Sequence, residues 1–127
     1  EHTFMTVSEA AGAFEAADYL DVQQTTTWAD NERDLTAWLG NKMQQGAISS
    51  LYNLEQQVIN SGDLQLIEDW RKLQASDNFY YMCTKWWSDG DVHAYFSPYE
   101  TPYIAYMNFI NAYHDIKHRL MEKGVDV

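Results

Sequence analysis

Apolar side chains recur at helical spacing along three stretches of this chain, and no stretch sustains the alternation typical of a half-buried strand. The first stretch, from residue 30 to residue 59, predicts one long helix. Its apolar stripe consists of Leu35, Trp38, Leu39, Met43, Ala47, Leu51, Leu54 and Val58. Gly40 and Gly46 interrupt this stretch, but each costs only about 1 kcal/mol relative to alanine, which packing can offset. A glycine here would also let a neighbouring backbone approach closely.

The same spacing predicts two further helices. Residues 60–63 end the first helix, and Asp63 is placed to cap the second. The stripe of the second helix consists of Leu64, Ile67, Trp70, Leu73, Asp77 and Tyr80, and extends at most to Tyr81. Thr101 and Pro102 begin the last helix, because threonine caps well and proline in the first turn loses no hydrogen bond. The stripe of this helix consists of Tyr103, Tyr106, Met107, Ile110, Tyr113, Ile116 and Leu120. Gly124 closes it.

The remaining segments are shorter. Thr6 and Glu9 have the spacing of a capping box, which predicts a short helix that stops near Ala17. Residues 18–27 are expected to form an extended connector lying on the rest of the fold, residues 88–91 a turn, and residues 92–99 an irregular segment. The predicted fold class is therefore all-α, an antiparallel helical bundle of three main helices plus a short N-terminal helix. Residues 1–127 are expected to form a single helical domain.

Charge and composition exclude several classes of partner. The chain has 127 residues, 8 basic and 19 acidic, and a net charge of −11, which repels phosphate backbones and anionic lipid headgroups. We therefore expect neither nucleic acid nor membrane as a partner. The chain begins with Glu1 rather than Met, so we expect a processed product or a piece of a longer protein. Its single cysteine, Cys83, excludes an internal disulfide and favours a reducing, cytoplasmic location.

Metal and cofactor sites are not expected. His114, His118 and Glu122 follow one another at one-turn spacing, but no fourth ligand is implied, and a solvated helix face explains them better. Asp89 and Asp91 flank a glycine but lack the further aspartates of a calcium loop, so a tight turn is the better interpretation. Cys83 is interpreted as a packing residue rather than a catalytic thiol.

Aromatic residues crowd residues 76–98 beyond what a helical core requires. Flat rings beside carboxylates and amides suit sugar recognition, because sugar C–H faces stack on rings while hydroxyls bond planar polar groups. Asp77 falls in the middle of an apolar stripe, and two interpretations stay open. Either it lies at the edge of the stripe, or it is a buried carboxylate held by an arginine or tyrosine.

A second candidate region precedes the long helix. Asp30, Glu32 and Asp34 suit the positive end of that helix, which alone would explain them. Capping does not require tryptophan, however, and Trp28 and Trp38 lie in the same stretch. Asp30 or Glu32 facing Asp77 could form the carboxylate pair of a glycosidase, about 5 to 10 Å apart, although nothing in the spacing shows it.

Two segments carry a resemblance to a known family. Residues 28–41 read Trp-Ala-Asp-Asn-Glu-Arg-Asp-Leu-Thr-Ala-Trp-Leu-Gly-Asn, and residues 76–82 read Ser-Asp-Asn-Phe-Tyr-Tyr-Met. Both resemble signatures of α-amylases of glycoside hydrolase family 57, as does the continuation to Tyr99. The second segment departs from the family at Asn78, where the family often has histidine; asparagine keeps a donor and an acceptor.

The resemblance implies a division of labour. In that family a catalytic barrel comes first, and a helical region follows it and packs against the mouth of the active site. The catalytic glutamate and aspartate reside in the barrel, so the resemblance implies no catalytic residue in this chain. The partners that it implies are the catalytic barrel of the parent chain and an α-glucan or maltooligosaccharide.

The resemblance also nominates substrate-binding residues. They are Trp28, Asp30, Glu32, Arg33, Asp77 and Tyr80. Trp28 is expected to stack on sugar, Arg33 and Asp77 to form a buried ion pair, and Trp38 to pack in the core. The chain is thus interpreted as the C-terminal helical domain of an α-amylase or 4-α-glucanotransferase, inactive alone. The alternative is a self-contained helical carbohydrate-binding or protein-interaction module.

Overall fold

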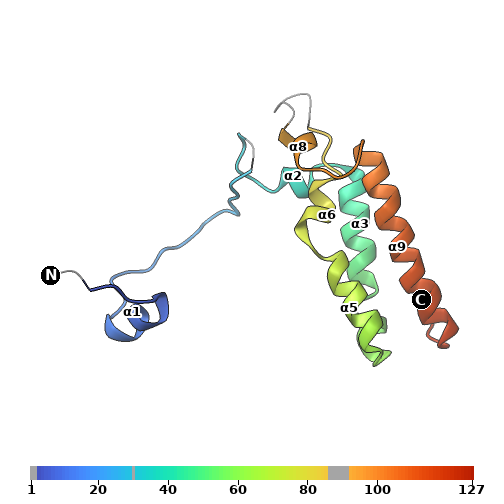
Figure 1. The fold of residues 1–127 in the computed structure, drawn as a ribbon, viewed down its shortest axis with the longest axis horizontal. Helices are drawn as coiled ribbons and strands as arrows, with labels where there is room; N and C mark the ends of the chain where they lie inside the picture. The colour runs from blue at the N-terminus through green and yellow to red at the C-terminus, as the bar shows by residue number, and fades with distance from the viewer. Residues whose placement is uncertain (1–2, 30, 86–91) are drawn as a thin grey trace.

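The computed structural model describes residues 3–29, 31–85 and 92–127, and every regular element in these ranges is a helix. The helices are α1 (Val7–Ala13), α2 (Thr36–Leu39), α3 (Lys42–Asn53), α4 (Glu55–Asn60), α5 (Leu64–Leu73), α6 (Ser76–Tyr80), α8 (Val92–Tyr95) and α9 (Pro102–Glu122). Helices α3, α5 and α9 lie side by side, with α5 antiparallel to the other two (Figure 1). The predicted all-α bundle of three main helices is confirmed. None of the described helices is long and apolar enough to cross a membrane.

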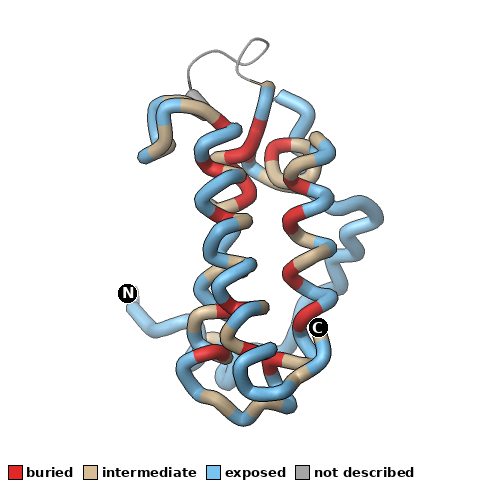
Figure 2. The backbone as a smooth tube through the Cα atoms, turned by 90° about the vertical axis from the view of Figure 1, so that its right-hand side faces the viewer, coloured by how far each residue is buried: buried red, intermediate tan, exposed pale blue. Residues whose placement is uncertain are grey.

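The core lies between these three helices, where the buried positions face inward (Figure 2). Its buried residues are Ala47, Leu51, Leu54, Val58, Leu66, Trp70, Phe79, Met82, Ala105, Phe109, Ile116 and Leu120. The stripe of the first stretch is confirmed from Ala47 to Val58. The predicted burial was wrong for Leu64, Tyr103 and Met107, because all three side chains are exposed. A shift of one residue turns a side chain by about 100° around a helix, and α9 presents Ala105 and Phe109 to the core instead.

The single long helix predicted for residues 30–59 is wrong, because the chain breaks it into α2, α3 and α4. The first break falls at Gly40, where an added Cβ would lie 2.2 Å from the backbone oxygen of Thr36. Only glycine fits this close approach. Asn41 then starts α3 with a capping box, its side chain accepting from the N–H of Gln44.

The other breaks have polar partners. The carbonyl of Leu51 accepts from Trp70 Nε1 at 2.8 Å, just before α3 ends. The predicted helix from residue 64 to residue 81 is likewise divided into α5 and α6. Asn78 Nδ2 donates to the carbonyls of Lys72 (3.1 Å) and Leu73 (3.2 Å), so the asparagine that departs from the family pattern caps the end of α5.

The chain before the bundle differs most from expectation. The capping box of Thr6 and Glu9 is present, but α1 ends at Ala13 rather than near Ala17. Residues 14–26 are exposed and lead away from the bundle, so the expectation that the connector lies on the fold was wrong (Figure 1). Residues 92–95 form the short helix α8 where an irregular segment was predicted. The predicted turn at residues 88–91 lies outside the described residues.

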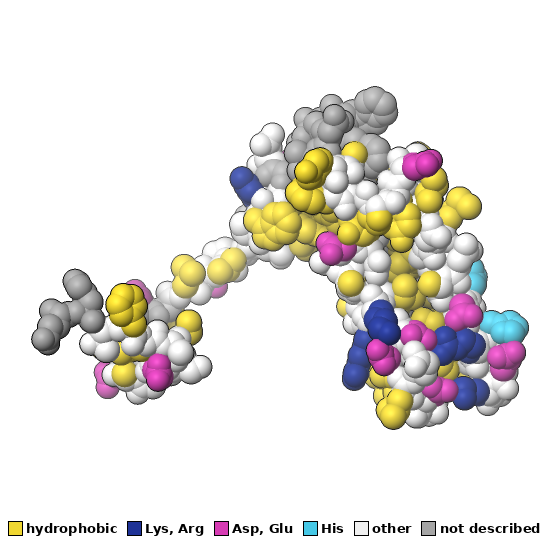
Figure 3. Space-filling view, in the orientation of Figure 1, with side chains coloured by type: hydrophobic (Ala, Val, Ile, Leu, Met, Phe, Trp, Pro, Cys, Tyr) yellow, Lys and Arg dark blue, Asp and Glu magenta, His cyan; other side chains and the backbone are white. Residues whose placement is uncertain are grey.

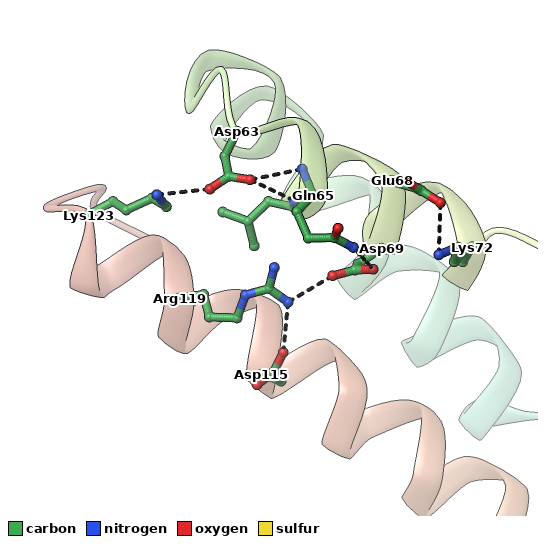
Figure 4. A network of polar contacts seen from close by, with 9 residues as sticks. Asp63, Gln65, Glu68, Asp69, Lys72, Asp115, Arg119 and Lys123 are labelled. Atoms are coloured by element: carbon green, nitrogen blue, oxygen red, sulfur yellow. Dashed lines mark hydrogen bonds and ion pairs between the residues drawn. The ribbon is translucent and has the colours of Figure 1, made fainter.

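Ion pairs join α5 to α9 at the end of the bundle away from α2 (Figure 4). Asp63 caps α5, as predicted, and lies 2.9 Å from Lys123 Nζ. Arg119 donates to Asp69 at 2.9 Å and to Asp115 at 3.1 Å. The hydrogen bond from Lys123, followed by the N–H groups of Leu66 and Gln65, lowers the pKa of Asp63 from 3.8 to about 2. The bond from Arg119 lowers the pKa of Asp69.

We expect the stability of the bundle to fall as the pH drops from about 4 to about 2. The folded state holds the pKa of Asp63 below its unfolded value, so this contribution is complete above pH 3.8 and disappears as the carboxyl is protonated. In Asp63→Asn the amide still caps α5 but does not titrate. Thermal unfolding at pH 5, 4, 3 and 2 should therefore show a smaller decline of Tm in Asp63→Asn. Parallel declines would contradict the assignment.

Candidate functional site

An aromatic wall, formed by Trp28, Trp38 and Tyr80, stands at the end of the bundle that carries α2 and α6. The rings of Trp28 and Trp38 meet edge to face with centroids 5.9 Å apart, and Trp38 lies 5.6 Å from Tyr80. Tyr80 is buried, whereas Trp28 is 77% exposed. Hydrophobic side chains gather on this end in Figure 3, while charged side chains gather at the opposite end. The wall therefore presents a ring face to whatever approaches this end.

Two cavities share the aromatic wall. The first, of about 410 Å³, is lined by Thr26, Thr27, Trp28, Leu35, Trp38, Leu39, Ile48, Tyr52, Gln74, Ser76 and Phe79. The second, of about 380 Å³, is lined by Trp28, Trp38, Ser76, Asp77, Tyr80, Tyr81 and Phe96. The second cavity combines ring faces with a carboxylate and hydroxyl groups, which is the mixture that a sugar requires.

A hydrogen-bonded loop holds Trp28 in place. The N–H of Thr27 donates to the carbonyl of Arg33 at 2.8 Å, and its hydroxyl donates to the carbonyl of Asp34 at 2.7 Å. The guanidinium of Arg33 donates to the carbonyl of Trp28. Arg33 has a φ of 54°, a left-handed conformation that costs a non-glycine residue about 1 kcal/mol or more. The loop bonds offset that cost, so the backbone of Trp28 is fixed although its ring is exposed.

Gln44 ties together the elements that carry the wall. Its side chain is fully buried, and Nε2 donates to the carbonyls of Ala37 (2.7 Å) and Phe79 (2.9 Å). Its Oε1 accepts from the N–H of Asn41 at 3.0 Å. Asn41 Nδ2 in turn donates to the carbonyl of Met82 at 2.8 Å. Ala37 and Phe79 directly precede Trp38 and Tyr80, so the Gln44 amide sets the spacing of the two rings.

Sequence reasoning missed Gln44 and Asn41. The available signal was the capping-box spacing of Asn41 and Gln44 directly after Gly40. That pattern would have predicted a helix start at residue 42. It could not have shown that the Gln44 side chain also reaches α6, at Phe79, or that Asn41 reaches Met82 just after it.

The structure brings together three of the six predicted site residues. Trp28, Asp77 and Tyr80 line the second cavity. Glu32 does not line it and instead accepts from Lys85 Nζ at 3.1 Å. Asp30 lies outside the described residues. The substrate-binding role of these six residues stays a prediction.

The prediction of a buried ion pair between Arg33 and Asp77 is wrong. Asp77 is exposed, which excludes the buried-carboxylate interpretation, and Arg33 bonds the Trp28 carbonyl instead. The physical reason is the break after α5. Because α6 begins anew at Ser76, Asp77 falls in its first turn, where a carboxylate faces the exposed N–H groups and solvent.

The arrangement provides little for hydrolysis. Among the described residues, Asp77 is the one carboxylate that lines either cavity of the wall. A third hollow, of about 310 Å³, contains Asp69 and Asp115, but Arg119 binds both, and the pKa of Asp69 is lowered. A glycosidase acid needs a raised pKa. The described residues also contain no cluster of three or more histidine, cysteine or acidic side chains that could hold a metal ion.

Comparison with known proteins identifies a relative of this chain. Over an alignment 128 residues long, the chain is 36% identical to a protein of Methanocaldococcus jannaschii that is named "Putative alpha-amylase". The match covers 93% of this chain and 27% of that protein, so the chain spans about a quarter of the length of its relative. No family model matches the chain, and no solved structure matches it.

We expect Gln44→Leu to lower the free energy of unfolding by about 2–4 kcal/mol, because two buried carbonyls and one N–H would lose their partner. Gln45→Leu is the matched control. Gln45 is the exposed neighbour, and its single bond to the Leu39 carbonyl is open to water. Urea unfolding followed by circular dichroism measures both changes. Equal, small losses in the two variants would show that Gln44 does not hold the wall.

Proposed function

We propose that this chain is the helical part of an amylase-type glycoside hydrolase that acts on α-glucans, with its catalytic domain elsewhere in a longer protein. The observation that carries the proposal is the 36% identity, which extends over 93% of the chain but over only 27% of a protein named as an alpha-amylase. The resemblance of residues 28–41 and 76–99 to glycoside hydrolase family 57 supports it. The family assignment and a cytoplasmic location belong to this proposal.

In this proposal, bond cleavage belongs to residues outside the chain. The chemistry needs two carboxyl groups on opposite sides of the scissile bond, one of them with a raised pKa. Among the described residues, Asp77 is the only carboxylate that lines the cavities of the aromatic wall, and Asp77 is exposed. The catalytic glutamate and aspartate would therefore come from the barrel, and the helical part alone would be silent.

The contribution of the chain is then to bind and orient the glucan. Trp28 offers an exposed ring, fixed at its backbone by Arg33, on which a sugar face can stack. Asp77 and Tyr80 line the same cavity and would bond the hydroxyl groups of that sugar. Glu32 binds Lys85 and would act from the rim of the cavity. Asp30 is proposed as a further contact. Such contacts hold a maltooligosaccharide without reacting with it.

The catalytic barrel would pack at the end of the bundle that carries the wall. Trp28, Tyr95 and Phe96 are largely exposed there, and Tyr95 and Phe96 meet edge to face at 5.0 Å. Packing against a second domain would remove these rings from water, which is favourable by roughly 25 cal/mol per Å². The same contact would enclose the second cavity and make it part of the active-site mouth.

The test compares the isolated chain with the product of the complete open reading frame. With maltoheptaose as substrate, we expect the isolated chain to release no reducing ends and the complete protein to hydrolyse or transfer the glucan. Turnover by the isolated chain that disappears in Asp77→Asn would contradict the proposal. So would a complete protein that is folded but inactive on α-glucans.

A titration of the isolated chain with maltoheptaose, followed by tryptophan fluorescence, tests the alternative. A saturable change in the micromolar range would favour a self-contained carbohydrate-binding module. No change would favour a site that the barrel completes.

A further inference from the structure

The segment before the bundle, residues 3–26, forms an N-terminal arm whose apolar side chains contact little of the described chain. It consists of α1 and the extended residues 14–26. Its large apolar residues Phe4, Val7, Phe14, Tyr19, Leu20 and Val22 are 64–98% exposed. Exposed apolar side chains gathered in one segment, rather than scattered singly, mark an interaction surface.

Helix α1 needs an external surface to be stable. It has seven residues, none of them buried, and isolated helices shorter than about 12 residues are marginal in water. Its start is nonetheless fully specified by the Thr6 capping box. Val7 and Ala11 lie one turn apart on one face of α1, and Phe14 follows directly as its C-cap. A helix with a specified start and a bare apolar face is built to pack against something.

The base of the arm is fixed beside the aromatic wall. Thr27 bonds the carbonyls of Arg33 and Asp34, and Thr26, the last residue of the arm, lines the first cavity next to Trp28. A surface that binds the arm would therefore lie next to the end of the bundle that carries the wall. The arm and that end would then contact one continuous partner surface.

The negative charge of the N-terminal arm indicates which kind of surface it can bind. The arm contains Glu9, Glu15, Asp18 and Asp21 and no lysine or arginine. Residues 33–127 are acidic as well, with 12 acidic and 8 basic residues, so a second copy would oppose the arm with like charge. An apolar surface with a basic rim is complementary to the arm.

The N-terminal arm has a counterpart in the longer relative. A match that covers 93% of 127 residues spans about 118 of them, so it must include residues 10–118 wherever it begins. Most of the arm thus has a counterpart in the relative, of which this chain spans only 27%.

We infer that the N-terminal arm docks on an apolar, basic-rimmed surface of the catalytic part of the longer protein and clamps that part to the bundle. The inference rests on the proposed function for the existence of this partner. The rings of Phe4, Phe14 and Tyr19 would each remove about 150–250 Å² from water. That is a large share of the roughly 800 Å² that each partner buries in an interface of standard size.

Amide hydrogen exchange on the isolated chain and on the complete protein tests the inference. We expect residues 10–22 to exchange rapidly in the isolated chain and at least about tenfold more slowly in the complete protein. The double variant Tyr19→Asp/Leu20→Asp should abolish this protection. Gln23→Asp/Gln24→Asp, which adds the same charge at neighbouring polar positions, should retain it.

Three results would overturn the inference. These are rapid exchange of the arm in the complete protein, protection of the isolated chain that rises with its concentration, and a reading frame without a further domain. Activity on maltoheptaose, measured on the same samples, separates this inference from the proposed function. Hydrolysis with an unprotected arm refutes the docking alone, whereas a protected arm without hydrolysis refutes the assigned activity alone.

Discussion

Two backbone carbonyls, one in α2 and one in α6, accept hydrogen bonds from the same buried amide, that of Gln44. Neither α2, with four residues, nor α6, with five, is long enough to persist by itself. Gln44 holds both short helices against the start of α3, and Asn41 holds Met82, just after α6. The spacing of Trp38 and Tyr80, and thus the shape of the second cavity, depends on these bonds.

Ion pairs lie at one end of the bundle and the candidate functional site lies at the other. Ion pairs of Asp63 with Lys123 and of Arg119 with Asp69 hold α5 against α9 at one end. At the other end the backbone is fixed, but the rings of Trp28 and Phe96 remain exposed. A rigid frame with an exposed aromatic surface is typical of a part that completes a site with another domain. In the proposed function this end would bind and position the glucan, and the catalytic carboxylates would come from the other domain.

The all-α class, the caps of α1, α5 and α9, and the aromatic character of the site were predictable because each depends on local spacing. The break at Gly40 had a local signal, the capping-box spacing of Asn41 and Gln44. The end of α3 and the placement of α2 against α6 had none, because they depend on contacts between segments far apart in sequence. The Trp70 indole reaches the Leu51 carbonyl, and Gln44 reaches Phe79 across 35 residues. Asp77 was misplaced because the break after α5, which Asn78 caps, moved it from an apolar stripe to the first turn of α6.

The claim that Trp28 binds the glucan is tested most directly by the specificity constant, kcat/KM, of the complete protein for maltoheptaose in Trp28→Ala. The account predicts a fall in kcat/KM of about tenfold, equivalent to a stacking contribution of roughly 1.4 kcal/mol, with partial recovery in Trp28→Phe. Tyr103→Ala is the matched control, because Tyr103 is also an exposed ring but lies outside both cavities. An unchanged kcat/KM in Trp28→Ala, or an equal loss in Tyr103→Ala, would contradict the account.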